Sequence, residues 1–243
     1  MNTTHLIKTL LAVVIATFFA LPAYSQKGEP KLALPPGEYF HNQQFSIVRY
    51  DNISELSDRV AKATGSVYLN DDWVAGTLYT SSGHVLPNAQ LKYDIKHDMM
   101  EINTPDGVKV LQGKYIKQFE LQEPAQKALY VSGSENDVAA GSHTAFYKVL
   151  ASAKDLKLLS RTELYLQQSN YSPQFDVGSK TDKLVKKEKL YLASGNNLAK
   201  LEKGSYTTFG DKADKVKAYA KSKKLKLNKK EDALNIMAYY NSL

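Results

Sequence analysis

The densest group of ionisable side chains lies in the stretch LKYDIKHDMMEI, residues 91–102. It holds Asp94, His97, Asp98 and Glu101. Carboxylates beside a histidine are the groups that general acid–base catalysis and metal binding use. These four residues are therefore the first place to look for chemistry, and the elements around them decide whether their side chains can converge.

The pattern around this group predicts a β-hairpin. Leu91, Tyr93 and Ile95 are apolar at every second position, which is typical of a half-buried strand and places Asp94 on its solvent side. Residues 96–98 form the turn, where Asp is favoured because its side chain accepts hydrogen bonds from nearby backbone N–H groups. We interpret the polar residues as parts of this turn and predict no catalytic or metal-binding role for them.

A second pair of carboxylates, Asp71 and Asp72, directly precedes Trp73, the only tryptophan. Two close carboxylates can raise one another's pKa and act as acid and base. Adjacent residues of a strand point to opposite faces, however. We therefore interpret the pair as a turn that enters a strand, and Trp73 as a core residue.

The histidines are the basis of an alternative hypothesis, in which the protein is an enzyme. After the N-terminal segment the histidines are scattered without a ligand-like spacing: His41, His84, His97 and His143. The HExxH, GxSxG, Walker and dinucleotide glycine motifs are absent from the sequence, so no catalytic residue, metal or cofactor is predicted. The alternative is an exported hydrolase, in which His97 or His143 lies within hydrogen-bond reach of a carboxylate in a cleft. Three residues could supply this carboxylate: Asp72, Asp94 and Asp98.

The first 25 residues predict a cleaved secretory signal peptide. Lys8 gives a positive start, residues 10–21 are almost entirely apolar, and residues 23–25 (AYS) place small side chains where a signal peptidase needs them. Cleavage after Ser25 would leave Gln26 as the first residue. The apolar run is shorter than the roughly 20 residues of a membrane span, and no cysteine is present to carry a lipid. We expect export to the periplasm or the medium, not a lipoprotein.

The composition limits the chemistry further. None of the 243 residues is cysteine, which excludes disulfides, thiol nucleophiles and thiolate zinc sites. The formal net charge is +7, but it is unevenly distributed. Residues 26–179 hold 15 basic and 18 acidic residues, whereas residues 180–232 hold 16 lysines and 7 acidic residues. The basic character therefore belongs to the C-terminal part.

Within this part, five lysines are candidates for contact with an anionic surface: Lys186, Lys187, Lys189, Lys223 and Lys224. Such an attraction is screened by salt. Lysines at the end of a helix also favour its dipole, which is a purely structural reason for them. No arginine follows Arg161, although arginine is the side chain best suited to bidentate phosphate binding. Nucleic acid is therefore not an expected partner, and a solvated basic face is the alternative to an anionic-surface site.

The periodicity along the chain predicts an α+β fold, which is mainly an antiparallel β-meander in a sandwich or open barrel, with a helical C-terminal cap. We expect a signal peptide (1–25), an extended arm with a short helix (26–65), a β-rich body (66–183), and a lysine-rich β-hairpin with C-terminal helices packed on that body (184–243). Asp211 is the expected N-cap of the first C-terminal helix, and Asn228, followed by Glu231, that of the second.

Two stretches carry a resemblance to a family. GSVYLNDDWVAGTLYTSSGHVLPNAQLKYDIKHDMMEI and LYLASGNNLAKLEKGSYTTFGDKADKVKAYAKSKKLKLNKKEDALNIMAYYNSL resemble exported proteins of the Bacteroidota that have no assigned activity. The resemblance covers most of residues 66–121 and 184–243. It implies export and a shared fold, and it supplies no catalytic residue.

These observations lead to the hypothesis of a non-enzymatic exported protein of the cell envelope, which binds a partner protein, glycan or lipid-like ligand through its β-surface. One variant is a carrier, which requires an apolar cavity lined by Tyr, Leu and Met. A filled core would instead favour an interaction module. No transmembrane span is expected in the mature chain, and the hydrolase remains the alternative.

Overall fold

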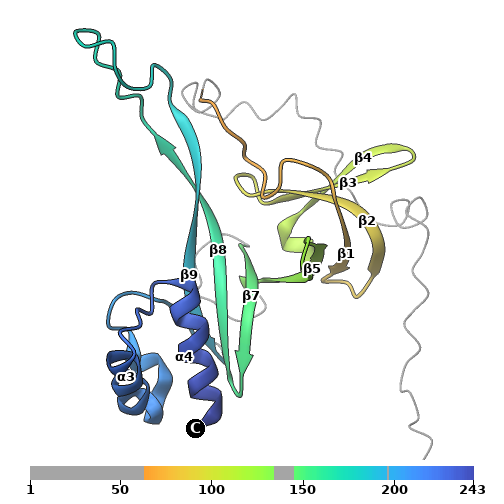
Figure 1. Cartoon of the computed structure of the whole chain (residues 1–243). Coiled ribbons are helices and arrows are strands. Elements are labelled where there is room, and N and C mark those ends of the chain that lie inside the picture. Colours follow the sequence, from red (N-terminus) through yellow and green to blue (C-terminus); the bar gives the residue numbers. More distant parts are fainter. Residues whose placement is uncertain (1–62, 134–144, 196) are drawn as a thin grey trace, which may run out of the picture. The chain divides into compact units, whose positions relative to one another are not determined.

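Ten strands pair into one antiparallel sheet that does not close, in the order β10-β9-β8-β7-β6-β5-β1-β2-β3-β4 (Figure 1). The computed structural model describes residues 63–133, 145–195 and 197–243, which all lie in the unit Lys31–Leu243. A helical region follows the sheet at the C-terminus. The predicted α+β meander with a helical cap is thus confirmed, and the sheet is open.

The strands have the following bounds: β1 (Val74–Thr80), β2 (Val85–Asp94), β3 (Met99–Thr104), β4 (Gly107–Gln112), β5 (Ile116–Gln122), β6 (Lys127–Ser132), β7 (Phe146–Ala153), β8 (Leu156–Gln167), β9 (Lys183–Ser194) and β10 (Asn197–Lys200). Short 3-10 helices occur at η2 (Gly113–Tyr115) and η4 (Tyr206–Lys212), and the α-helices are α3 (Ala213–Ser222) and α4 (Lys230–Ser242). Among the described strands, each pairs with its sequence neighbours except where β1 pairs with β5.

The first hydrophobic core is formed by residues of β1 to β7. Phe119 of β5 is fully buried at its centre, and its ring stacks on that of Tyr130, with a centroid distance of 4.8 Å. Tyr93 and Phe146 complete the aromatic group, with their rings 5.3 Å apart. The aromatic residues thus fill the space that a carrier of apolar ligands would keep open.

The second core lies between the sheet and the helices. Leu158 of β8 and Leu192 of β9 are fully buried in one cluster with Val216 of α3 and Ile236 of α4. Figure 1 shows α4 alongside β8 and β9. Every third or fourth residue of α4 is buried, namely Ala233, Ile236, Met237 and Tyr240, as an amphipathic helix on a sheet requires. Burial of this stripe, and not capping, therefore determines where α4 lies.

Both predicted helix caps are wrong. The residue before α3 is Lys212 and the residue before α4 is Lys229, and neither makes a side-chain capping bond. A 3-10 helix occupies Asp211, so the chain is already helical there. At α4 the carboxylate of Asp232 accepts a bond of 2.9 Å from the backbone N–H of Lys226, which fixes the link between the two helices from within the helix.

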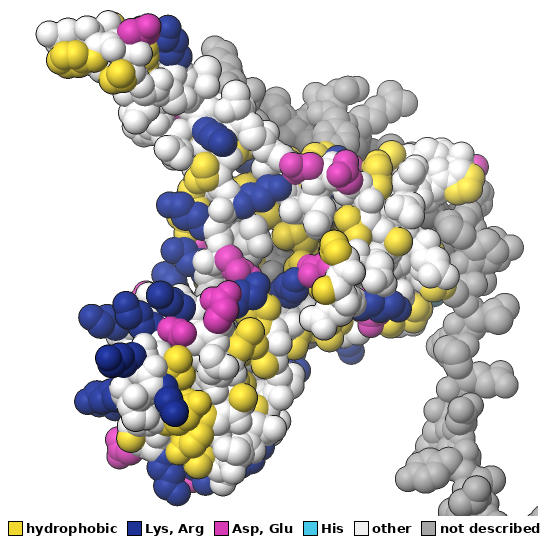
Figure 2. Space-filling model, in the orientation of Figure 1, with side chains coloured by type: hydrophobic (Ala, Val, Ile, Leu, Met, Phe, Trp, Pro, Cys, Tyr) yellow, Lys and Arg dark blue, Asp and Glu magenta, His cyan; other side chains and the backbone are white. Residues whose placement is uncertain are grey.

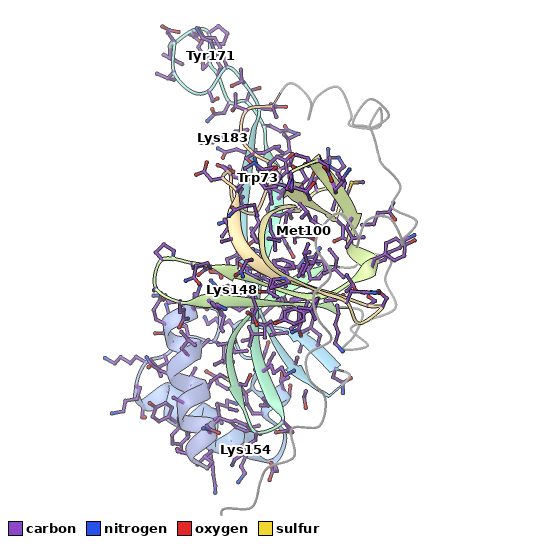
Figure 3. All side chains as sticks on the ribbon, turned by 90° about the vertical axis from the view of Figure 1, so that its right-hand side faces the viewer. Trp73, Met100, Lys148, Lys154, Tyr171 and Lys183 are labelled. Atoms are coloured by element: carbon purple, nitrogen blue, oxygen red, sulfur yellow. The ribbon has the colours of Figure 1, made fainter. Side chains whose placement is uncertain are left out.

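The outer halves of β8 and β9 form a two-stranded arm, residues 163–187, in which Glu163 pairs with Lys187 and Gln167 with Lys183. Loop 168–182 joins the strands. Figure 3 shows Tyr171 at the end of the arm, Lys183 nearer the sheet, and Lys154 at the other end of β8. No residue of the arm is fully buried, so its side chains remain available for contacts.

Several predictions fall outside the described residues. These are the signal peptide, most of the extended segment and short helix expected at residues 26–65, and two histidines, His41 and His143. In the part of the chain that is described, no helix combines the length and apolarity that crossing a membrane needs.

Candidate functional site

The ionisable group at residues 94–101 lies at a β-hairpin, as predicted. β2 ends at Asp94, β3 begins at Met99, and the four residues between them form the turn. Asp98 has a φ of 53°, a left-handed conformation that Asp tolerates better than most residues. The turn is therefore confirmed; Lys96 is exposed, whereas the side chains of His97 and Asp98 are partly buried.

Asp94 corrects the sequence analysis, because it is buried, with 2% of its surface exposed. Its Oδ1 accepts hydrogen bonds from the backbone N–H groups of Lys96 (2.9 Å) and His97 (3.0 Å). Its Oδ2 lies 2.7 Å from Nδ1 of His97. The alternating pattern predicted an exposed carboxylate, whereas this one turns inward and organises the turn.

His97 is held by this carboxylate and keeps one ring nitrogen unused. Since an ionised carboxylate only accepts hydrogen bonds, Nδ1 carries the proton toward Asp94. The other nitrogen, Nε2, is buried and has no hydrogen-bond partner within the described part of the chain. An aspartate thus fixes the orientation of an imidazole whose second nitrogen is free to act on a ligand.

Asp98 is fixed from two sides. The hydroxyl of Tyr93 donates a hydrogen bond of 2.7 Å to its Oδ1, and burial together with the charge of Asp98 raises the pKa of Tyr93. Gly113 packs against the same carboxylate, since a Cβ atom at Gly113 would lie 2.2 Å from Oδ1. The turn therefore brings two carboxylates with different partners to one end of the hairpin.

Glu101 is also buried, with 5% exposure, and faces away from the turn. It accepts a hydrogen bond of 2.8 Å from the hydroxyl of Tyr68. Burial raises its pKa above the usual value for Glu. Its role is in the local packing, separate from His97.

A pocket of about 360 Å³ lies beside the turn. His97, Asp98 and Tyr93 line one side, and Phe146 and Arg161 belong to the residues that line the other. Arg161 was missed as a site residue. It lies more than 60 positions further along the chain, on β8, and no local signal links it to the turn. Only the pairing of β6, β7 and β8 brings it here.

The other predicted positions are separate from this pocket. Asp71 and Asp72 are exposed, and hydrogen bonds from Ser66 and Lys186 lower the pKa of Asp71. Trp73 is half-buried, not a core residue. The ammonium of Lys92 lies 5.9 Å from its ring centroid.

The lysines proposed for anionic contact fall into two groups. On β9, Lys186 forms an ion pair of 3.0 Å with Asp71, while Lys187 and Lys189 lie 5.0 Å and 5.7 Å from the ring centroid of Tyr165. The second group, Lys223 and Lys224, follows the C-terminus of α3, where the helix dipole favours positive charge.

An ion pair brings the two groups toward one another. Lys230 at the start of α4 lies 3.0 Å from Glu188 of β9. The link between α3 and α4 is thereby placed beside the lysine-bearing strand. Figure 2 shows lysine side chains over the helical region and along the strands on this face.

No group of three or more potential metal ligands occurs among the residues that the structure describes. The comparisons find no matching family model, no matching curated protein and no matching solved structure.

Proposed function

We propose that the chain is an exported, non-enzymatic binding protein of the cell envelope, and that it docks on an anionic lipid surface through the arm. The observation that carries this proposal is the end of the arm, where Phe175 and Val177 are 70% and 57% exposed. Exposed large apolar residues at a projecting tip, next to lysines, have the chemistry of a peripheral contact with phosphate-bearing lipids.

The tip is an ordered turn that presents these side chains. Tyr171 donates a hydrogen bond of 2.7 Å to Asp176, and the backbone N–H of Ser172 donates one of 2.9 Å to the carbonyl of Val177. Such an arrangement keeps Phe175 from folding back onto its own strands. The apolar group therefore needs little additional ordering when it inserts into a surface.

Charge supports the same partner. Lys183, Lys187 and Lys189 have no carboxylate within ion-pair distance among the described residues. A lysine near an anionic lipid surface contributes about 1 kcal/mol of binding free energy. Three such lysines would add enough binding free energy to the weak apolar contact of the tip for vesicle binding to be measurable. Separately, the packed aromatic core favours a surface contact over a carrier cavity.

Vesicle sedimentation tests the proposal. The purified chain should bind vesicles of phosphatidylcholine with phosphatidylglycerol, and should bind pure phosphatidylcholine at least about tenfold more weakly. Binding should weaken as salt rises. Replacing three lysines of β9 (Lys183→Gln, Lys187→Gln and Lys189→Gln) should abolish it.

A matched control removes three exposed lysines away from the arm, Lys114→Gln, Lys157→Gln and Lys203→Gln. This control changes the net charge equally and should retain vesicle binding. Equal loss in both variants would show that total charge, not the arm, is responsible. No binding by the unaltered chain would reject the lipid partner and leave a partner protein as the occupant of the arm.

A second candidate, the exported hydrolase, is favoured by one observation. His97 lies 2.7 Å from Asp94 beside a pocket, which is the geometry that the hypothesis required. Among described residues, however, no hydroxyl group is bonded to Nε2. Activity assays with p-nitrophenyl esters and glycosides distinguish the candidates, since turnover that disappears in His97→Ala would replace the binding proposal.

A further inference from the structure

The pocket beside the His97 turn has no role in the contact made by the arm. It combines a cation, a histidine nitrogen without a partner, a carboxylate that is already bonded and an apolar wall. Its volume of about 360 Å³ falls at the small end of the usual range for ligand sites, roughly 300–1,000 Å³. These features together define what kind of molecule it can hold.

Arg161 supplies the charged contact. Its guanidinium lies 5.9 Å from the ring centroid of Tyr147, and among the described residues no carboxylate lies within ion-pair distance of it. A planar guanidinium presents parallel N–H donors that match the two oxygens of a carboxylate. Glu163, two residues further along β8, interacts with this charge from beyond ion-pair distance, and a ligand anion would make the direct contact.

His97 supplies the second contact. With the Nδ1–H directed at Asp94, Nε2 is the ring nitrogen left to bond a ligand group. A polar atom that is buried without a hydrogen-bond partner is costly. A ligand hydroxyl group in the pocket would donate to this atom and remove that cost.

Asp98 limits the charge of the ligand. Its carboxylate lines the same pocket and already accepts the bond from Tyr93. Its charge repels a dianionic phosphate group more strongly than a single carboxylate directed at Arg161. Ile95 and Phe146 line the remaining wall, against which the C–H face of a compact ring can pack.

We propose that this pocket binds a small hydroxylated carboxylate of the uronic acid type. Its carboxylate lies on the guanidinium of Arg161, and one hydroxyl donates to Nε2 of His97. The ligand is either a free sugar acid or the end of an acidic polysaccharide, since both present the same group. This site goes beyond the proposed function and does not depend on it.

Isothermal titration calorimetry with the purified chain tests the ligand class. D-galacturonate should bind, while D-galactose, which lacks the carboxylate, and galactose 6-phosphate should bind at least about tenfold more weakly. Equal binding of galactose, or no binding of galacturonate, overturns the proposal. Trigalacturonate separates the two sources: tighter binding than the monomer indicates a polymer end, and equal or weaker binding indicates the free acid.

Two substitutions test the named contacts without removing the fold. His97→Asn keeps an N–H group that can donate to Asp94 and deletes Nε2, so it should weaken galacturonate binding about tenfold. Arg161→Lys retains a positive charge without the fork and should weaken binding by a similar factor. Lys157→Gln, on the same strand outside the pocket, should bind as the unaltered chain does.

Thermal unfolding of each variant shows whether it is folded under the conditions of titration. Unchanged affinity in a folded His97→Asn or Arg161→Lys variant would overturn the assignment of that residue. The position of the ligand can be checked by NMR titration with galacturonate. Chemical-shift changes that are confined to the arm, and absent from residues around the His97 turn, would place the ligand elsewhere and overturn the proposed site.

Discussion

At two hairpin ends of this molecule the side chains depart from the usual rule that polar groups are exposed and apolar groups are buried. At the β2–β3 turn, the polar residues Asp94 and His97 are drawn inside and bonded to one another. At the end of the arm, the apolar residues Phe175 and Val177 are exposed. A buried polar group costs stability unless a partner compensates for it, whereas an exposed apolar group leaves surface that a binding partner can cover.

The comparison teaches where each compensation comes from. Asp94 finds its partners within three residues of its own position, so the turn is largely complete in the isolated chain. Phe175 has no such cover among the described residues, and under the proposed function a surface outside the chain covers it. The first region should therefore respond to substitution through stability, and the second through binding.

The largest effect is expected at Asp94. Asp94→Ala leaves two backbone N–H groups and Nδ1 of His97 without their acceptor, and should lower the free energy of unfolding by about 2–4 kcal/mol. Urea denaturation measures this. Asp94→Asn, which keeps one acceptor oxygen, should lose about half as much. A loss below about 0.5 kcal/mol in Asp94→Ala would show that the turn does not depend on its carboxylate.

Gly113 should come second. The Cβ of Gly113→Ala would overlap the carboxylate of Asp98, and we expect a loss of about 1–3 kcal/mol. The double variant Gly113→Ala with Asp98→Ala removes the overlap. Its loss should therefore be smaller than the sum of the two single losses, as thermal unfolding of all four proteins would measure. Additive losses would place the strain elsewhere.

Glu101 should have a smaller effect that depends on pH. Burial raises its pKa in the folded chain, so the folded state holds the proton more tightly than the unfolded state does. Stability from this group is full below the usual pKa of Glu and is lost as pH rises through the raised pKa. Glu101→Gln keeps an acceptor for Tyr68 and removes this dependence.

At neutral pH, Glu101→Gln should raise stability by about 1 kcal/mol or less, and the difference from the unaltered chain should shrink in acid. Denaturation curves at several pH values measure it. A Gln variant that is less stable at neutral pH than in acid, relative to the unaltered chain, would contradict the direction of the shift.

The smallest effect on folding is expected at the tip of the arm. Phe175→Ser removes an exposed ring and should change the free energy of unfolding by less than about 0.5 kcal/mol, while vesicle binding falls several-fold. Ser172→Ala on the same loop is the control and should affect neither. If Phe175→Ser unfolded the chain, the ring would be part of a packed surface and the contrast between the two hairpin ends would disappear.

The sequence predicted local structure well, because alternation and turn residues are local properties. The turn after Asp94 and the lysine-rich hairpin of β9 and β10 are both where the pattern placed them. The burial of Asp94 could not be predicted in this way. A strand pattern assigns one face to solvent, whereas the last residue of β2 turns its carboxylate back over the following residues.

The pocket could not be predicted from the sequence, for a different reason. Arg161 and Phe146 join His97 only after β6, β7 and β8 have added to the sheet, and neither residue carries a motif. The helix caps failed because α3 and α4 are fixed by the burial of residues such as Val216 and Ile236, so that capping side chains were dispensable.

The single pairing between β1 and β5 sets the order in which the chain can fold. Every other pair of described strands joins chain neighbours, and such contacts close short loops quickly. Joining Gly76 to Leu121 encloses β2, β3 and β4, so it costs more loop entropy. We therefore expect this closure to be the slow step, and the later strands to assemble on β5 once it has formed.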